Sequence, residues 1–224
     1  MKVGYAILYE DGTLTISKEH TILQKPIYKD YDEFDDTDIP WKNDHTEIKI
    51  VRIIGQVKSN DMSAWFEDCY NLTTLIDFQN LDVSDCEDFV FTFYGCKSLT
   101  DISSLKNWNV SNGMDFAYMF DHCESLMNIS ALANWNVVNG KDFSFMFYVC
   151  ESLQNINGLQ NWDVSNGEDF SGMFSYCVSL KEIHLPDTLC NLKANMFKDC
   201  NSNLKIHWKG KIYTYEDLLE YKSF

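Results

Sequence analysis

Several kinds of segment are missing from this sequence of 224 residues. Lys and Arg total only 18 against 34 Asp and Glu, which gives a net charge of -16. Direct binding to nucleic acid or to an anionic membrane is not expected, because like charges repel. No run approaches the ~20 apolar residues of a membrane helix, and no signal peptide is predicted, because Glu10 and Asp11 interrupt the short apolar start. The chain as written is expected to be soluble and cytoplasmic.

Motifs of catalysis and metal binding are missing as well. The sequence has no P-loop, G-x-S-x-G, Rossmann glycine set or H-E-x-x-H. None of the eight cysteines forms a CxxC pair, which excludes the usual zinc spacing. The five histidines share no repeat position with a partner. We therefore expect neither an enzyme nor a bound cofactor or metal, and we expect reduced thiols that pack as small apolar groups.

What the sequence does contain is a repeat. The strings "NWNVSNGMDFAYMFDHCESL", "NWNVVNGKDFSFMFYVCESL" and "NWDVSNGEDFSGMFSYCVSL" begin at residues 107, 134 and 161, a period of 27 residues. Such a period predicts a solenoid, in which one unit cannot bury its own apolar face and successive units stack into a common core. Full units begin at Ile53, Asn80, Asn107, Asn134 and Asn161, and a shortened sixth runs from Thr188 to His207.

The unit at residues 107–133 predicts two short elements. Asp115 is placed to cap a helix, and Phe116, Met119, Phe120 and Cys123 follow at the i, i+3, i+4, i+7 spacing of one helical face. The next string, "SLMNI", predicts a strand that pairs in parallel with the same strand of the following unit. Equivalent side chains then form core columns, including the tryptophans at the corners. In one such column we expect Phe120, Phe147 and Phe174 to lie one above another.

Both ends of such a stack need covers. The alternating string "GYAILYEDGTLTIS" predicts an N-terminal hairpin that turns at Asp11-Gly12. At the other end, Lys209-Gly210 predicts a second hairpin and Thr214 to Tyr221 a short helix, with Thr214 and Asp217 as a capping box. The predicted fold class is α/β, a leucine-rich-repeat solenoid of about six 27-residue units. Its predicted parts are an N-terminal cap with an acidic loop at 1–52, repeats at 53–207 and a C-terminal cap at 208–224.

The string "SNGEDFSGMFSYCVSL" at 165–180 resembles the BspA-like leucine-rich repeat. The pattern of that family runs from a W-D-x-S-N turn through N-M-S-x-M-F-x-x-C to S-L-x-x-L. The resemblance covers about residues 53–207, and the flanking segments resemble the family's caps. It implies a solenoid that binds macromolecules without catalytic residues, and in many members an exported bacterial surface protein that acts in adhesion. From the sequence as written we expect no leader, lipobox or anchor, which would be one departure from the family. A second departure is Gly and Asp-Phe where Val-Thr and Asn-Met are frequent in the family.

Residues 28–47 form a strongly acidic segment outside the repeats, with eight acids and two lysines. Dense carboxylates resemble a phosphate backbone, and interleaved aromatics are frequent contact residues, so the segment is a candidate loop for binding a basic protein. Two alternatives remain, a solvated loop whose aromatics pack on the first unit and a calcium site without EF-hand spacing. The candidate residues are Asp30, Tyr31, Asp32, Glu33, Phe34, Asp35, Asp36, Asp38 and Trp41.

Two variable columns within the repeats are further candidates. They are interpreted either as packing of the short helix or, if exposed, as an aromatic stripe for docking. The first column reads Phe91, Tyr118, Phe145 and then Gly172. The second column reads Tyr94, Asp121, Tyr148 and Ser175.

The sequence therefore predicts a non-enzymatic protein-binding module. The first hypothesis is an acidic solenoid that binds and blocks a basic protein that handles nucleic acid, such as a phage or mobile-element inhibitor of a host nuclease. The alternative is a bacterial surface adhesion protein of the BspA-like type, at the cell surface if a leader was removed. An enzyme or metal protein is kept as a third alternative.

Overall fold

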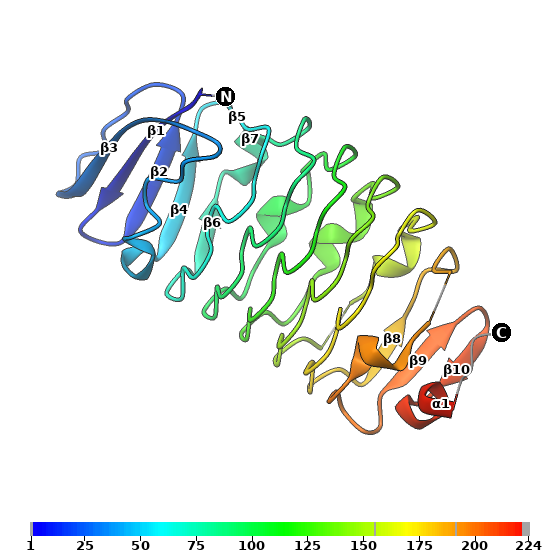
Figure 1. Cartoon of the computed structure of the whole chain (residues 1–224). Helices are drawn as coiled ribbons and strands as arrows, with labels where there is room; N and C mark the ends of the chain where they lie inside the picture. Colours follow the sequence, from blue (N-terminus) through cyan, green and yellow to red (C-terminus); the bar gives the residue numbers. More distant parts are fainter. Residues whose placement is uncertain (1, 155, 191, 221–224) are drawn as a thin grey trace.

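The protein is a stack of coils, seen in a computed structural model that describes residues 2–154, 156–190 and 192–220 (Figure 1). No helix in these ranges is long and apolar enough to cross a bilayer. The strands are β1 (Lys2–Tyr9), β2 (Thr13–Ser17), β3 (Ile27–Asp35), β4 (Ile50–Ile54), β5 (Val57–Lys58), β6 (Thr74–Ile76), β7 (Leu81–Asp82), β8 (Glu182–His184), β9 (Lys205–Trp208) and β10 (Lys211–Tyr213). The helices are the 3-10 helices η1 (His45–Glu47), η2 (Phe78–Asn80), η3 (Ser103–Leu105), η4 (Ser130–Asn134), η5 (Leu159–Asn161) and η6 (Ala194–Phe197), and the α-helix α1 (Tyr215–Glu220).

The predicted N-terminal hairpin is confirmed. β1 and β2 pair antiparallel, with Leu8 opposite Leu14. Gly12 in the turn has a φ of 84°, which glycine adopts without a steric cost, and Asp11 Oδ1 accepts the N–H of Thr13 at 3.0 Å. β2 then pairs in parallel with β4, and β4 with β6. Hairpin and first coils thus share one sheet, and the boundary proposed at residue 52 falls inside β4.

Equivalent side chains of successive coils lie in columns, as predicted. Phe120 is 0% exposed, and its ring centroid lies 5.4 Å from that of Phe93 and 5.6 Å from that of Phe147. The column continues from Phe147 to Phe174 at 5.6 Å, with ring planes 8° apart. Each coil therefore buries its aromatic side chain against its neighbours, which supplies the hydrophobic stabilisation that an isolated coil lacks.

The periodic tryptophans and cysteines inside the stack donate hydrogen bonds to the preceding coil. Trp135 donates from Nε1 to the carbonyl of Leu105 at 3.1 Å, and the thiol of Cys123 donates to the carbonyl of Phe93 at 3.3 Å. The equivalent tryptophans and cysteines repeat these bonds in the neighbouring coils. All eight cysteines are free thiols, and the periodic ones form a packing column.

The helix predicted at residues 116–123 is wrong. Tyr118 and His122 have φ values of 59° and 56°, which a right-handed helix cannot contain. The segment is instead a succession of turns, in which Met119 donates to the carbonyl of Phe116 at 3.3 Å and Asp121 to that of Tyr118 at 3.1 Å. We call residues 116–123 and their equivalents in the other coils the turn segments. Asp115 accepts the N–H of Ala117 at 2.9 Å and so begins a turn rather than capping a helix.

Hydrogen bonds between coils explain why turns replace the helix. In an α-helix each interior N–H would bond within the segment. In the turn segments every second N–H is free to reach the next coil. The N–H groups of Phe116, Tyr118, Phe120 and His122 donate to carbonyls of the next coil at 2.9, 3.0, 2.9 and 2.8 Å. The buried residues still follow the spacing of a helical face, which is why the sequence imitates a helix.

The strand predicted at "SLMNI" is not assigned in the inner coils. Within the described ranges, extended pairs of coil strands occur near the two ends of the stack. In the inner coils single parallel bridges join Asp88 to Asp115, Asp115 to Asp142 and Asp142 to Asp169. The stretch that follows in each of three inner coils holds one of the 3-10 helices η3, η4 and η5. The expected α/β composition is thus too helical, since α1 is the sole α-helix of the described part.

The predicted C-terminal cap is confirmed. β8 and β9 run parallel, and β9 and β10 form an antiparallel hairpin with Trp208 opposite Lys211. The helix α1 follows, and Thr214 and Asp217 form the capping box. The N–H of Thr214 donates to Asp217 Oδ2 at 2.7 Å, and the N–H of Asp217 donates to Thr214 Oγ1 at 3.2 Å. Tyr221, the expected last residue of this helix, lies outside the described residues.

Candidate protein-binding surface

The acidic segment at residues 28–47 covers the end of the stack and is not a projecting loop. Its first part is β3, which pairs antiparallel with β1 at the edge of the sheet. Tyr31, Phe34 and Trp41 are only 6%, 6% and 1% exposed, and Trp41 donates from Nε1 to the carbonyl of Trp65 at 2.6 Å. These aromatics cover the first coil, as the alternative interpretation expected, and partner binding by them stays an untested prediction.

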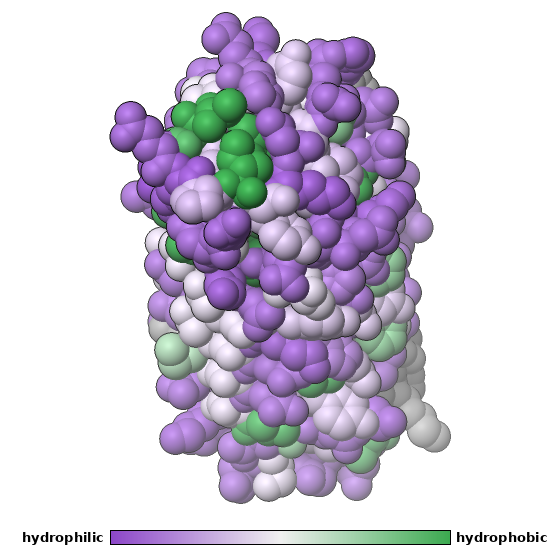
Figure 2. Space-filling view, turned by 90° about the vertical axis from the view of Figure 1, so that its left-hand side faces the viewer, coloured by the Kyte–Doolittle hydropathy of each residue, from purple (hydrophilic) through white to green (hydrophobic). Residues whose placement is uncertain are grey.

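The acids of this segment differ in their surroundings. Asp36 is 2% exposed and accepts the N–H of Asn60 at 3.0 Å, and Asp35 is half-buried. Exposed side chains belong to Asp30, Asp32, Glu33 and Asp38. Basic side chains already lie beside three of these four, namely His20 beside Asp30, Lys2 beside Glu33 and Lys42 beside Asp38. Figure 2 faces this end and shows a mostly hydrophilic surface with a compact hydrophobic cluster at its upper left and smaller hydrophobic patches near the lower and right-hand edges.

The other candidate residues, Phe91, Tyr118 and Phe145, form a column of stacked rings on the turn segments. The ring centroid of Tyr118 lies 5.0 Å from that of Phe91 and 5.0 Å from that of Phe145. All three side chains are half-buried. The column therefore packs on itself and also contributes to the molecular surface, so each of the two interpretations of the sequence describes part of it.

The backbone of this column is in an unusual conformation. Phe91, Tyr118 and Phe145 have φ values of 58°, 59° and 55°, a left-handed conformation that costs roughly 1–2 kcal/mol for a residue other than glycine. Ala64 and Gly172 occupy the same position in other coils. The turn therefore does not require an aromatic residue. The conformation itself recurs in the turn segments of the other coils, as at Asp68 and Val149.

A second row of rings runs beside the first column. It joins the column where Tyr94 contacts Phe91 at 5.3 Å and Tyr148 contacts Phe145 at 5.4 Å. Along this row, Tyr94, His122, Tyr148 and Tyr176 follow one another with ring centroids 5.9, 5.8 and 5.3 Å apart. All four side chains are half-buried. We call the two rows together the aromatic face, which consists of Phe91, Tyr94, Tyr118, His122, Phe145, Tyr148 and Tyr176.

The sequence singles out Tyr94 and Tyr148 but not the other two members of this row. His122 and Tyr176 stand one position later, in a column that also contains Gly95 and Val149. Residues of this column likewise have positive φ values. Gly95 is the one signal in the sequence that could have marked this column as a turn position. Side chains at such a position point outward.

Carboxylates surround the aromatic face with negative charge. Asp121 is 3% exposed, and its Oδ1 lies 2.6 Å from Nδ1 of His122. Burial raises the pKa of Asp121 to about 6, although His122 acts in the opposite direction. Burial and the negative charges of Asp121, Asp68 and Glu67 also raise the pKa of Tyr94. The rings thus lie in a negative field, which suits a cationic side chain above a ring face.

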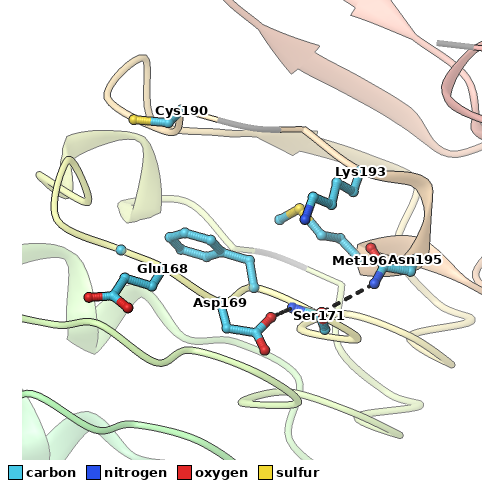
Figure 3. Close-up of a pocket in the computed structure, with 9 residues that line it drawn as sticks. Glu168, Asp169, Ser171, Cys190, Lys193, Asn195 and Met196 are labelled. Carbon is cyan, nitrogen blue, oxygen red and sulfur yellow. Dashed lines mark hydrogen bonds between the residues drawn. The ribbon is translucent and has the colours of Figure 1, made fainter. Parts of the chain in front are cut away.

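A small cavity between the fifth unit and the shortened one is not a substrate site (Figure 3). Asp169 and Asn195 both bond to Ser171 there. The N–H of Ser171 donates to Asp169 Oδ1 at 2.7 Å, and Asn195 Nδ2 donates to Ser171 Oγ at 3.2 Å. The cavity measures about 30 Å³, which is room for about one water molecule and far below the ~300 Å³ of a ligand pocket.

The coil stack places the protein in the class of leucine-rich-repeat-like solenoids. A leucine-rich cell surface protein from Faecalibacterium prausnitzii A2-165 has a crystal structure similar to 96% of this chain, with a TM-score of 0.53 and 19% sequence identity. A leucine-rich repeat protein from Bacteroides ovatus ATCC 8483 matches 93% of the chain with a TM-score of 0.40 and 17% identity. The chain spans 58% and 52% of the lengths of these two proteins. At such identities the first likeness shows the fold alone.

The sequence then shows the family. Residues 60–187, more than half of the chain, match the family described as "Mycoplasma protein of unknown function, DUF285", and the chain belongs to that family. No curated protein matches the sequence. The comparisons agree with the resemblance to leucine-rich repeat proteins at the level of the fold, and the narrower BspA-like assignment stays a prediction.

Proposed function

We propose that the protein is a non-catalytic binding module whose aromatic face docks on another protein. The observation that supports this proposal is the set of three bulky rings at left-handed positions where Ala64 and Gly172 show that a small residue suffices. Tyrosine is among the residues most enriched at interface hot spots. Each ring packs against its neighbours in the stack, so its side chain is already ordered before docking. Docking therefore costs little side-chain entropy.

The partner is proposed to present Arg and Lys side chains on its surface. The chain carries a net charge of -16, which favours encounter with a basic protein. A cation over a tyrosine ring contributes about 0.5–1 kcal/mol at an exposed site and more when water is excluded. The exposed acids of the segment at 28–47 lie on the N-terminal cap and contribute to the field that attracts the partner. The narrower hypothesis, that this partner handles nucleic acid and is blocked, rests on charge alone.

Photo-cross-linking from a single coil tests the docking surface. A benzoylphenylalanine side chain is introduced at Tyr118 in one sample and at Met127 in a control sample, in cells that normally produce the protein. Met127 belongs to the same unit and is 49% exposed, but it is not part of the aromatic face. We expect a specific cross-linked protein from position 118 and none from position 127. An identical product from both positions, or a product from position 127 alone, would refute the proposed surface.

Affinity measurement against the captured protein tests the proposed chemistry. The double variant Tyr118→Ser/Tyr148→Ser should lose binding, whereas Met127→Ser should retain it. Raised salt should weaken binding by the unchanged protein, because screening reduces charge attraction. Asn or Gln at the four exposed acids, Asp30, Asp32, Glu33 and Asp38, should slow association. Binding that is indifferent both to salt and to these four changes would contradict a basic partner.

An adhesion-type role is the second candidate, favoured by the name of the similar structure from F. prausnitzii, a cell surface protein. Both candidates use a protein-binding surface, so location separates them. Protease treatment of intact cells should digest the protein if it acts in adhesion. Recovery of the protein in the cytosolic fraction alone, protected from the protease, would dismiss this candidate.

A further inference from the structure

The strands β8 and β9 lie side by side at the C-terminal end of the stack (Figure 1). Two histidines and a glutamate of these strands come together. Glu182 and His184 are two residues apart on β8, so the alternation of a strand places both side chains on the same face. β9 runs parallel to β8, with His207 as the register partner of His184. The pairing of these two strands thus brings a second imidazole to the face that already holds the first.

The possible ligand atoms of this cluster lie close together. Nε2 of His207 is 2.7 Å and Nε2 of His184 is 3.5 Å from the same atom, Oε1 of Glu182. The two imidazole rings stack with centroids 4.2 Å apart, and the three ligand atoms all lie within 4.8 Å of one another. A tetrahedral zinc ion with bonds of ~2.1 Å holds its ligand atoms ~3.4 Å apart. Small side-chain rotations therefore suffice to place all three around one ion.

One nitrogen of the cluster lacks a hydrogen bond. Nε2 of His207 is buried and makes no hydrogen bond, and Oε1 of Glu182 lies 2.7 Å from it as an ion-pair neighbour. A buried polar atom without a partner destabilises the fold. A cation held by Glu182 and the two histidines would bind the lone pair of this nitrogen and would balance the carboxylate charge.

The histidines also depart from the repeat. Earlier units have Ser103, Ser130 and Asn157 at the position of His184. His184 and His207 are equivalent residues of successive coils, but they are 23 residues apart because the last unit is shortened. The expectation that no histidine shares a repeat position with another is therefore wrong for this pair. Residues that depart from the scaffold pattern are the ones available for a separate function.

The cluster is accessible to an ion from solvent. A surface hollow of about 520 Å³ is lined by residues that include His184, His207, Asp187 and Trp208. The side chains of His184 and Glu182 are 50% and 53% exposed. Three protein ligands beside an open hollow leave a fourth coordination position for water or for a group from another molecule.

We propose that Glu182, His184 and His207 bind a divalent transition-metal ion, and that Zn²⁺ is the preferred ion. Two imidazoles and one carboxylate form a ligand set that Zn²⁺ uses in three-residue sites with a fourth position open. Imidazole nitrogen suits zinc, copper and nickel, whereas Mg²⁺ and Ca²⁺ prefer oxygen ligands. The bound ion would fasten β8 to β9 and so tie the last full coil to the C-terminal cap. This site is independent of the docking proposal.

Isothermal titration of ZnCl₂ into the full chain, stripped of metal with a chelator, tests the site. All samples carry Cys190→Ser, because this thiol is exposed and could bind zinc by itself. We expect one equivalent of bound Zn²⁺, and we expect His184→Asn, His207→Asn and Glu182→Gln each to weaken it by at least ~10-fold, a loss that even a supporting residue of a metal site causes. His122→Asn, a matched change outside the cluster, should bind like the parent, and Mg²⁺ should not bind.

Two results would overturn the metal site. One is the absence of stoichiometric Zn²⁺ binding to the folded parent, which would leave a simple pair between His207 and Glu182. The other is binding that survives the double variant His184→Asn/His207→Asn. A circular dichroism spectrum of each variant without zinc checks that it is folded. As a further check, Lys205→Ala should tighten binding, because Lys205 is the register partner of Glu182 and brings a positive charge near the ion.

Discussion

Phe120 and Tyr118 belong to the same turn segment but are assigned different roles, and substitutions at the two positions separate these roles. Phe120 is 0% exposed and stacks between Phe93 and Phe147. Phe120→Ala should lower the free energy of unfolding by ~3–5 kcal/mol, the usual cost of emptying a buried aromatic site. This is a large part of the roughly 5–15 kcal/mol that stabilises a typical domain.

Tyr118→Gly should lower the free energy of unfolding much less than Phe120→Ala does. Tyr118 makes two ring contacts at 5.0 Å, each contributing about 0.5–1.5 kcal/mol. Glycine at a φ of 59° relieves a backbone cost of about 1–2 kcal/mol. The two effects oppose each other, so we expect a net loss of at most ~2 kcal/mol, below the loss expected for Phe120→Ala. Tyr118→Ala loses the same contacts with little relief and should be less stable than Tyr118→Gly by ~1 kcal/mol.

Equilibrium urea unfolding followed by far-ultraviolet circular dichroism measures these differences. We compare the parent with Phe120→Ala, Tyr118→Gly and Tyr118→Ala. Where the free energy of unfolding falls with urea concentration at the same slope, a shift in the midpoint reports a change in stability. If Tyr118→Gly is as destabilising as Phe120→Ala, the half-buried column of Phe91, Tyr118 and Phe145 is part of the scaffold, and the basis of the docking proposal fails. If Phe120→Ala costs nothing, the stacked phenylalanines are not the core.

Two further predictions concern titratable groups. The pKa of Asp121 is about 6 in the folded protein, above its unfolded value of about 3.9, so its contribution to stability is complete below pH ~4 and is lost as pH rises through 6. Asp121→Asn should therefore remove part of the gain in melting temperature on going from pH 7 to pH 5, and an unchanged gain would contradict the assignment. Burial raises the pKa of the thiols of Cys69, Cys96, Cys123, Cys150 and Cys177. A thiol reagent at pH 8 should thus label Cys190 rapidly and these five only after unfolding, and fast labelling of any of the five in the native protein would contradict the stacked column.

Much of the fold could be predicted because periodic residues make the same contacts in every coil. The spacing of Phe120, Phe147 and Phe174 predicts a stack whatever the conformation of the chain between them. The hairpin at Asp11-Gly12 and the capping box at Thr214 depend on neighbouring residues alone, and both are confirmed. Such features need no knowledge of distant contacts.

The helix at residues 116–123 was predicted wrongly because a local pattern cannot reveal a hydrogen bond to another coil. Phe116, Met119, Phe120 and Cys123 are all buried, as a helical face would be. The N–H groups of Phe116 and Phe120 nevertheless reach the next coil. Glycine at positions 95 and 172 was a local sign of left-handed turns. The helical spacing of the apolar residues was the stronger signal, and it predicted a helix instead.

The candidate binding residues were predictable only in part. Composition marks the segment at 28–47 as acidic but does not show that Tyr31 and Trp41 turn inward to cover the first coil. The aromatic column at Tyr118 is visible in the sequence, whereas its half-exposed state depends on a positive φ. The pair His184 and His207 escapes a search at period 27, because the shortened last unit changes the spacing to 23.

The most direct test of the stacked architecture is the unfolding curve of a chain that lacks one whole unit, residues 107–133. If equivalent side chains lie in columns, Phe147 takes the place of Phe120 on Phe93, and the shortened protein still folds. We expect a cooperative urea transition at lower stability, since stability in a repeat stack is roughly a sum over units and their interfaces. Deletion of residues 107–119, which is not a whole unit, should abolish the transition. Loss of cooperative unfolding in the whole-unit deletion as well would contradict a scaffold built from equivalent stacked coils.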